Sequence, residues 1–203
     1  MDLIRQNKFF NAKEFYFKTS YPMIGPMVSP PINGDIILGN SATEANNHLD
    51  VLEVVQKYKQ TGQKIIMPLS YGNERYRSWL RPQIQNSEVQ PLYDFMPRKE
   101  YFQLIAKCSY AVFGIIRQQA MGNVNFAISK GIKVFLYKDS IVYQNLKELG
   151  FVVYTIEDMN EDSFRTPLTP LEIEQNNFAR IAEYNRRLGI YNQFIQDVTH
   201  KRE

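Results

Sequence analysis

The chain has 203 residues, of which 44% are hydrophobic, and it carries a formal net charge of +3 at pH 7. This length suits one large domain, or one domain with a tail, and the apolar content is enough for a core. The net charge is too small to indicate a nucleic-acid partner, so none is expected. No stretch approaches the roughly 20 apolar residues of a transmembrane helix.

Cysteine and histidine are rare in the chain. The single cysteine, Cys108, excludes an internal disulfide and fits a reducing compartment, so we expect a cytoplasmic protein. The apolar residues before it predict the buried face of a helix, and Cys108 is therefore interpreted as a core residue rather than a nucleophile. Two histidines without a Cys/His cluster argue against a structural zinc site.

The first 34 residues differ in character from the rest. Lysines alternate with aromatic residues up to Lys18, and four prolines follow between Pro22 and Pro31. A basic, aromatic stretch is compatible with peripheral contact to the anionic inner face of a bacterial membrane. Because no helical periodicity is evident, we favour a strand at 14–18 that ends in an extended linker. The predicted organisation is a strand and linker over 1–34, a ligand-binding domain over 35–165 and a helical tail over 166–203.

From residue 35 onward, short apolar runs rich in β-branched residues alternate with amphipathic helical patterns. The predicted strands are 35–39, 64–69, 89–93, 110–114, 133–137 and 151–156. The predicted helices are about 43–60, one around 76–80, 98–109, one that opens within 117–123 and ends at Gly131, 141–149 and about 170–198. Six such β/α steps predict an α/β fold, a Rossmann-like parallel sheet with helices on both faces.

The first predicted strand ends in a tight turn, Gly39-Asn40-Ser41. Glycine lets the backbone approach a ligand, and the free N–H groups of the following helix attract anions. Ligands of open α/β sheets bind beyond the carboxyl ends of the strands, so this turn is the first candidate site. Taken alone, the turn is more typical of a plain junction, in which Gly39 bends the chain and Ser41 caps a helix.

The segment 117–123, Arg-Gln-Gln-Ala-Met-Gly-Asn, is the strongest local pattern for ligand binding. Arg117 follows a strand where a helix opens. Gln118 and Gln119 come next, and Gly122 allows close approach to the helix N-terminus. Backbone donors, a helix dipole and a bidentate cation are what a diphosphate requires. The alternative is a surface arginine beside a polar cap.

Other strand ends direct polar residues toward the same crevice. Ser70, Tyr71 and Asn73 follow the second strand, and Asp94 follows the third. His48 has two interpretations of equal weight: a polar position inside the first helix, or an imidazole that reaches the crevice.

Several cofactor motifs are absent. The chain has no Gly-x-x-x-x-Gly-Lys-Ser/Thr and no Gly-x-Gly-x-x-Gly at the first turn, which argues against a P-loop enzyme and against a nicotinamide or flavin cofactor. No pair of acids stands at a strand end, so neither a metal nor another cofactor is expected. The motifs predict a metal-independent binder of a nucleotide diphosphate and go no further.

The same residues resemble a known family of bacterial transferases. Its members add 4-acetamido-4,6-dideoxygalactose (N-acetylfucosamine) from the TDP derivative to a lipid-linked saccharide of enterobacterial common antigen. The likeness rests on short pieces that fall in one order over about residues 14–162. These pieces are 37–41 with Asn46 and His48, Pro68 with Tyr71, Asn73 and Tyr76, 117–119 with Gly122, 131–132, and Asp158 with 160–162.

The resemblance implies the C-terminal domain of a GT-B glycosyltransferase, which holds a nucleotide-sugar donor. It also implies a lipid-linked saccharide as acceptor and Arg117 as the group that stabilises charge on the leaving diphosphate. Family members are longer and carry an amino-terminal acceptor domain. The resemblance therefore implies that catalysis needs a partner chain or a further domain.

Two rival functions remain open at this point. One is a non-catalytic nucleotide-binding module of the same fold. The other is a protein-interaction domain without a ligand, in which Arg117→Ala would be silent. A nucleotide-sugar epimerase is a lesser alternative, because no convincing acid/base pair stands on both sides of a sugar.

Overall fold

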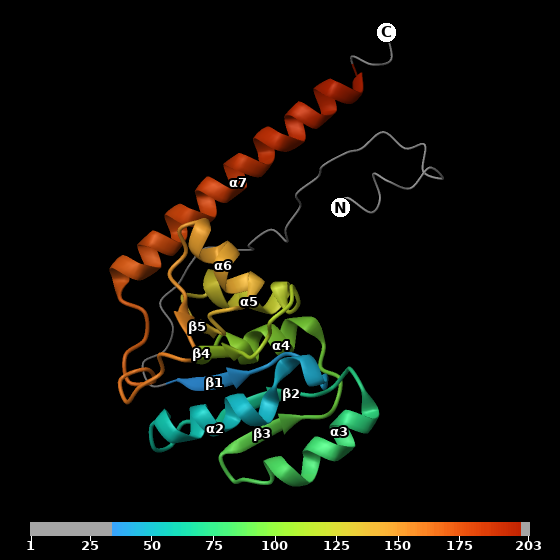
Figure 1. Ribbon diagram of the computed structural model, residues 1–203, viewed down its shortest axis with the longest axis vertical. Helices are drawn as coiled ribbons and strands as arrows, with labels where there is room; N and C mark the ends of the chain where they lie inside the picture. The colour runs from blue at the N-terminus through green and yellow to red at the C-terminus, as the bar shows by residue number, and fades with distance from the viewer. Residues whose placement is uncertain (1–33, 200–203) are drawn as a thin grey trace. The chain divides into compact units, whose positions relative to one another are not determined.

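The computed structural model describes residues 34–199 (Figure 1). The strand, linker and membrane contact predicted for the first 33 residues lie outside the described residues. The chain divides into two compact units, and the sheet lies within the unit that spans residues 21–184. The described part of the other unit is 185–199, the end of the last helix. Within 34–199, no helix is long and apolar enough to cross a membrane.

The unit 21–184 is built on six parallel strands in the order β3-β2-β1-β4-β5-β6. The strands are β1 (Asp35–Leu38), β2 (Ile65–Pro68), β3 (Val89–Leu92), β4 (Cys108–Phe113), β5 (Lys133–Leu136) and β6 (Tyr154–Thr155). The order reverses between β1 and β4, which pair directly through Ile37 and Ala111. At such a reversal the two connections leave toward opposite faces of the sheet and open a crevice at the carboxyl ends of the strands.

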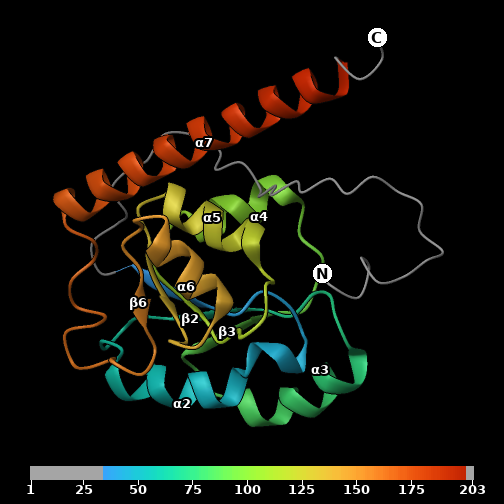
Figure 2. The same ribbon diagram turned by 45° about the horizontal axis from the view of Figure 1, so that its top comes forward.

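Short helices connect the strands, and one long helix follows them (Figure 1). The helical elements are η1 (Glu44–Asn46), α2 (His48–Tyr58), α3 (Glu74–Leu80), η2 (Arg81–Ile84), α4 (Arg98–Ile105), α5 (Met121–Ser129), α6 (Ile141–Glu148) and α7 (Pro170–Thr199). Figure 2 shows α2 and α3 on one side of the sheet and α4 and α5 on the other.

Alternate residues of the four central strands supply two separate cores. In β1, Ile36 and Leu38 belong to the core that includes Val55 of α2. Ile37, between them, belongs to the core that includes Val124 of α5. Strands buried on both faces have apolar residues at consecutive positions, which is why the sequence shows continuous apolar runs. The predicted Rossmann-like sheet with helices on both faces is confirmed.

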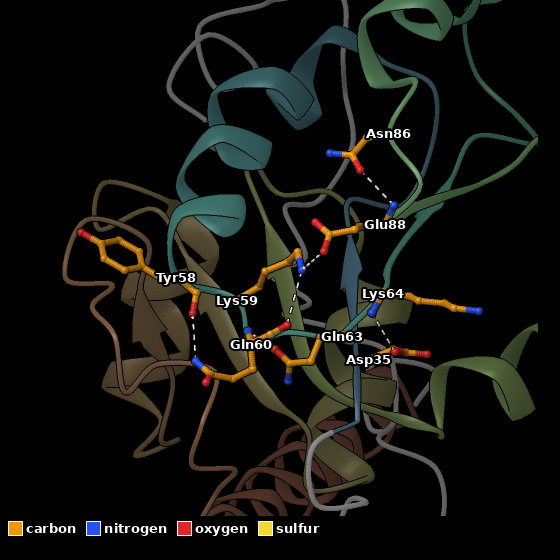
Figure 3. A network of polar contacts seen from close by, with 8 residues as sticks. All are labelled: Asp35, Tyr58, Lys59, Gln60, Gln63, Lys64, Asn86 and Glu88. Atoms are coloured by element: carbon orange, nitrogen blue, oxygen red, sulfur yellow. Dashed lines mark hydrogen bonds and ion pairs between the residues drawn. The ribbon is translucent and has the colours of Figure 1, made fainter.

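At the amino ends of the strands, a network of hydrogen bonds joins the loop after α2 to the residues that precede β3 (Figure 3). Lys59 Nζ donates to Glu88 Oε1 at 2.7 Å, and only 6% of the Lys59 side chain is exposed. The Glu88 N–H donates to Asn86 Oδ1, and the Lys64 N–H donates to Asp35 Oδ1, both at 2.9 Å. These bonds satisfy backbone groups beside β1, β2 and β3, at the end of the sheet opposite the crevice.

The first half of α7 is attached beside β6. Asn176 is fully buried; its Oδ1 accepts from the Val152 N–H at 2.7 Å and its Nδ2 donates to the Val152 carbonyl at 3.3 Å. Ala179, one turn further on, packs into the same core as α5 and α6. A side-chain amide here takes the place of a neighbouring strand. The predicted strand 151–156 is therefore wrong in extent, since β6 contains only two residues.

The predicted first helix is wrong at its start. Instead of a helix from about residue 43, the chain makes the short η1 turn, and Asn47 adopts a left-handed φ of 47° before α2 begins at His48. Ala45, which falls in the first turn of the predicted helix, is exposed. The Asn47 side chain donates to the Gly114 carbonyl at 2.6 Å, so the break in the helix is fixed by a contact with the end of β4.

The placement of Cys108 on a helix is also wrong. The helix α4 ends at Ile105, and Cys108 begins β4, where it pairs with Asp35 of β1. Strand pairing with a distant segment overrides the local helical pattern here. Cys108 is fully buried, and this burial raises the pKa of its thiol to about 12, in keeping with its interpretation as a core residue.

Candidate functional site at the ends of β1 and β4

A cavity of about 430 Å³ lies at the carboxyl ends of β1 and β4. The residues that line it come from the turn after β1, the turn after β2 and the first turn of α5: Asn40, Tyr71, Gln118, Gln119, Ala120, Met121, Gly122 and Asn123. None of these side chains carries a formal charge. The cavity brings together three of the segments that the sequence singled out, and their juxtaposition follows from the reversal of strand order.

The turn after β1 is shaped by Gly39 and by the histidine beneath it. Gly39 has a φ of +70°, and a Cβ at this position would lie 2.9 Å from His48 Nε2. His48 is fully buried as the first residue of α2, and its Nδ1 lies 3.0 Å from the Tyr76 hydroxyl. Burial lowers the His48 pKa to about 4. His48 is therefore a neutral support for the turn and does not line the cavity.

Asn46 holds the rest of the turn in place from inside. This residue is fully buried, and its Oδ1 accepts from the Asn40 N–H at 3.2 Å. Its Nδ2 donates to the Ser41 carbonyl at 3.1 Å and to Thr43 Oγ1 at 2.8 Å. Ser41 is itself buried and turned toward this network rather than toward the cavity. The sequence predicted no structural role for Asn46, which was noted only as part of the family resemblance.

Asn40 reaches the cavity and is fixed by Tyr71. Its side-chain Nδ2 donates to the Tyr71 hydroxyl at 2.8 Å. Its Oδ1 is buried and has no hydrogen-bond partner among the described residues. Tyr71 is 57% exposed and is held close to β1 because the Ala42 N–H donates to the Tyr71 carbonyl at 2.8 Å. The turns after β1 and β2 together hold the Asn40 Oδ1 in a fixed position at the cavity.

Gly72 keeps these two strand ends in contact. It has a φ of +120°, and a Cβ on it would lie 2.5 Å from the Ala42 carbonyl oxygen. The next residue, Asn73, donates its N–H to the same Ala42 carbonyl at 2.7 Å and caps α3 by accepting from the Tyr76 N–H at 3.2 Å. Asn73 thus has a capping position in this structure and does not line the cavity.

The N-terminus of α5 forms the other wall. Ala120, which precedes the helix, has a left-handed φ of 56° and provides no side-chain cap. The first N–H groups of a helix have no partner within the helix, so Met121 and Gly122 bring polar backbone to the cavity. A Cβ on Gly122 would meet nothing within 4 Å, which leaves this wall open. Gln119 is anchored by a bond from its Nε2 to the Ala45 carbonyl at 3.3 Å.

Three predicted residues do not line this cavity. Arg117 is exposed on the connection between β4 and α5, and within 34–199 it forms no ion pair. Ser70 is partly exposed after β2, and Asp94 is exposed after β3. Within the same part of the chain, no group of three or more His, Cys, Asp or Glu residues is placed to hold a metal ion.

Comparison with solved structures places the sheet in a known fold. The chain is similar to the α,α-trehalose 6-phosphate synthase of Burkholderia multivorans, with a TM-score of 0.58 and 10% identity over 83% of this chain and 42% of that one. It is similar to AviGT4, a glycosyltransferase involved in avilamycin A biosynthesis, with a TM-score of 0.55 and 12% identity over 85% of this chain and 51% of that one. These likenesses show the fold of GT-B glycosyltransferases. The chain spans about half the length of either structure.

Comparison with family models goes beyond the fold. Residues 4–185 match the family described as 4-alpha-L-fucosyltransferase, glycosyl transferase group 56. The match runs through every strand of the sheet and through both the turn after β1 and the start of α5. The family resemblance drawn from the sequence is confirmed, and the chain belongs to the 4-alpha-L-fucosyltransferase family, glycosyltransferase group 56.

Proposed function

We propose that this chain is the donor-binding domain of a glycosyltransferase. It binds a nucleotide-diphosphate sugar, with TDP-N-acetylfucosamine as the donor, in the cavity at the ends of β1 and β4. The observation that carries the proposal is an open cavity at the strand-order reversal whose wall is the uncapped N-terminus of α5. Family membership and the GT-B fold support glycosyl transfer as the reaction class.

The diphosphate of the donor is bound at the start of α5. A helix N-terminus presents unpaired N–H groups and about half a positive charge, which suits an anion. No charged side chain lines the cavity, so the helix N-terminus neutralises only part of the diphosphate charge. The exposed side chain of Arg117, next to Gln118 in the chain, neutralises the rest. As the glycosidic bond breaks, negative charge grows on the leaving diphosphate, and these preorganised groups stabilise it.

We propose that donor binding needs no metal ion. The helix N-terminus and a guanidinium supply what a bound cation would supply elsewhere.

The acceptor in this proposal is a lipid-linked saccharide. A second domain or a partner chain binds it and contributes the base that removes the proton from the attacking hydroxyl. The family assignment supports a saccharide acceptor, and the coverage of only 42% and 51% of two GT-B structures supports the need for a further domain. We further propose that the protein works at the cytoplasmic face of a membrane, where such an acceptor resides.

Calorimetric titration of the chain with TDP, UDP and GDP, with EDTA present, tests the donor site. We expect saturable binding of TDP and weaker binding of GDP. Arg117→Ala is expected to weaken TDP binding roughly 10- to 100-fold, the range for a hydrogen bond to a charged group.

Arg165→Ala is the matched control, because Arg165 is also an exposed arginine but pairs with Asp162 and Gln60 away from the cavity. It should leave the affinity for TDP unchanged. Absence of binding to all three nucleotides would contradict the proposal and favour an interaction module of the same fold. Equal losses in both arginine variants would show that only general electrostatics is involved.

A further inference from the structure

We propose that Asn40 is a specificity-determining residue that accepts a hydrogen bond from the sugar of the donor, while the diphosphate lies at the start of α5. This inference rests on the proposed function and adds the orientation of the ligand and the residue that recognises its sugar. The sugar group that meets Asn40 is a hydrogen-bond donor, either a hydroxyl or the N–H of an acetamido substituent.

The first observation is the unsatisfied oxygen of Asn40. The residue is only 8% exposed, it lines the cavity, and its Oδ1 has no partner among the described residues. A buried polar atom without a partner costs roughly 1–3 kcal/mol, and native proteins retain such atoms where a ligand or water satisfies them. An amide oxygen can only accept, so the group that it meets must carry a proton.

The second observation is that this oxygen is held in place. The Asn40 backbone N–H is fixed by Asn46 Oδ1 at 3.2 Å, and the side-chain Nδ2 is fixed by the Tyr71 hydroxyl at 2.8 Å. This bond uses one of the two Nδ2 hydrogens and holds the side chain with its unpaired Oδ1 available to a hydrogen-bond donor. The binding geometry is thus set before the ligand arrives, which lowers the entropic cost of binding.

The two walls of the cavity therefore have opposite polarity. The α5 side presents backbone N–H groups near Met121 and Gly122 and favours anionic acceptors. The β1 side presents the oxygen of Asn40, which repels phosphate oxygens and favours donors. A nucleotide sugar has an anionic diphosphate next to a neutral ring rich in O–H and N–H groups, and only one orientation of it satisfies both walls.

The test compares the affinities of TDP and TDP-N-acetylfucosamine by calorimetry in three variants of the whole chain. In the wild type, the sugar should add affinity over TDP alone. In Asn40→Ala, affinity for the TDP-sugar should fall about tenfold and affinity for TDP should change less than twofold. That difference corresponds to one neutral hydrogen bond to a buried group.

Asn40→Asp keeps an acceptor at the same place but adds a negative charge. It should weaken both ligands through repulsion of the diphosphate and yet preserve the ratio of their affinities. A preserved ratio of TDP-sugar affinity to TDP affinity in Asn40→Asp indicates recognition of the sugar. A structural disturbance of the turn would lower both affinities and this ratio as well. The control is Asn86→Ala, which removes an asparagine that bonds to Glu88 at the opposite end of the strands and should change neither affinity.

Three outcomes would overturn the inference. An equal loss of TDP and TDP-sugar binding in Asn40→Ala would place Asn40 against the nucleotide. Unchanged affinities in Asn40→Ala would leave its oxygen without a role. Collapse of the ratio in Asn40→Asp would show that the amide nitrogen matters. Failure of the wild type to bind TDP at all would instead count against the proposed function, and so the two failures are distinguishable.

Discussion

At the scale of single residues, the candidate site depends on buried side chains that never touch the cavity. Asn46 makes four hydrogen bonds to the turn after β1, and His48 lies under Gly39. Both are fully buried. The bonds of Asn46 satisfy both atoms of its amide and fix a single conformation of the loop, whereas His48 Nε2 has no hydrogen-bond partner among the described residues. The shape that Asn40 presents to a ligand is therefore set one layer beneath it.

His48 makes the stability of the protein depend on pH. Its pKa is about 4 in the folded chain because burial disfavours the imidazolium, whereas the pKa of an unfolded histidine is about 6.5. The contribution of neutral His48 is complete above pH 6.5 and is lost as the pH falls toward 4. A difference of this size corresponds to about 3 kcal/mol of unfolding free energy. Urea denaturation at pH 7 and at pH 4.5 should show the loss.

The variant His48→Gln isolates this effect. Glutamine keeps a polar group near the Tyr76 hydroxyl but does not titrate. Hydrogen bonds from Tyr154 and Thr169 lower the pKa of Glu172 in the folded state, so its contribution to stability is also lost in acid. This contribution is the same in the wild type and in His48→Gln. The wild type should therefore lose more stability than His48→Gln between pH 7 and 4.5. Parallel loss in the two proteins would mean that His48 is charged in the folded state.

At the scale of elements, the start of α5 is the part that the ligand proposal uses most directly. The helix begins after Ala120, several residues beyond the end of β4, and the intervening loop is what leaves space for the cavity. A hydrogen bond from the Ile141 N–H to the Ile116 carbonyl, at 3.1 Å, ties this loop to the start of α6. The loop is thus held by α6 before any ligand binds, so ligand binding does not carry the entropic cost of ordering it.

Filling the space beside α5 should block binding without unfolding the chain. A Cβ at Gly122 has open surroundings, so Gly122→Ala should raise stability by about 0.5–1 kcal/mol through helix propensity. Gly122→Leu should fold equally well but place its side chain in the cavity and weaken TDP binding at least tenfold. Thermal denaturation and calorimetry of both variants test this. Full TDP affinity in Gly122→Leu would show that the nucleotide binds elsewhere.

At the scale of the whole molecule, one end of the sheet is stabilised by polar contacts and the other end carries the candidate site. The amino ends of β1, β2 and β3 are joined by the bonds around Lys59 and Glu88, while the carboxyl ends carry the cavity (Figure 3). Rigid strands position loops that would be imprecise by themselves. Binding at one end is thereby coupled to the stability of the whole sheet.

TDP should stabilise the whole fold in the absence of metal ions. A ligand that binds only the folded state at 100 times its dissociation constant adds about 2.7 kcal/mol, which for a chain of this size raises Tm by roughly 5–10 °C. Scanning calorimetry with TDP and EDTA measures the shift, and inorganic phosphate at the same ionic strength is the control. A shift that appears only when magnesium replaces EDTA would contradict metal-independent binding.

The sequence by itself determined the alternation of strands and helices and the polar character of each strand end. Apolar runs such as 35–38 and 133–136, followed by amphipathic stretches, allow only a layered α/β fold. The pieces 39–41 and 117–123 were visible because glycine and polar residues interrupt these runs where a strand ends. Local periodicity carries this information, and it needs no contact between distant residues.

Only the tertiary structure decided which of those residues meet. Strand order places Asn40 and Tyr71 opposite Gln118 and Gly122, and no local pattern encodes that order. Contacts between distant segments also ended α4 before Cys108, stopped the first helix short at Asn47 and buried His48 beneath Gly39. Each of these reflects a gain in pairing or burial that outweighs local propensity, because the free energy of packing exceeds that of helix preference at a single residue.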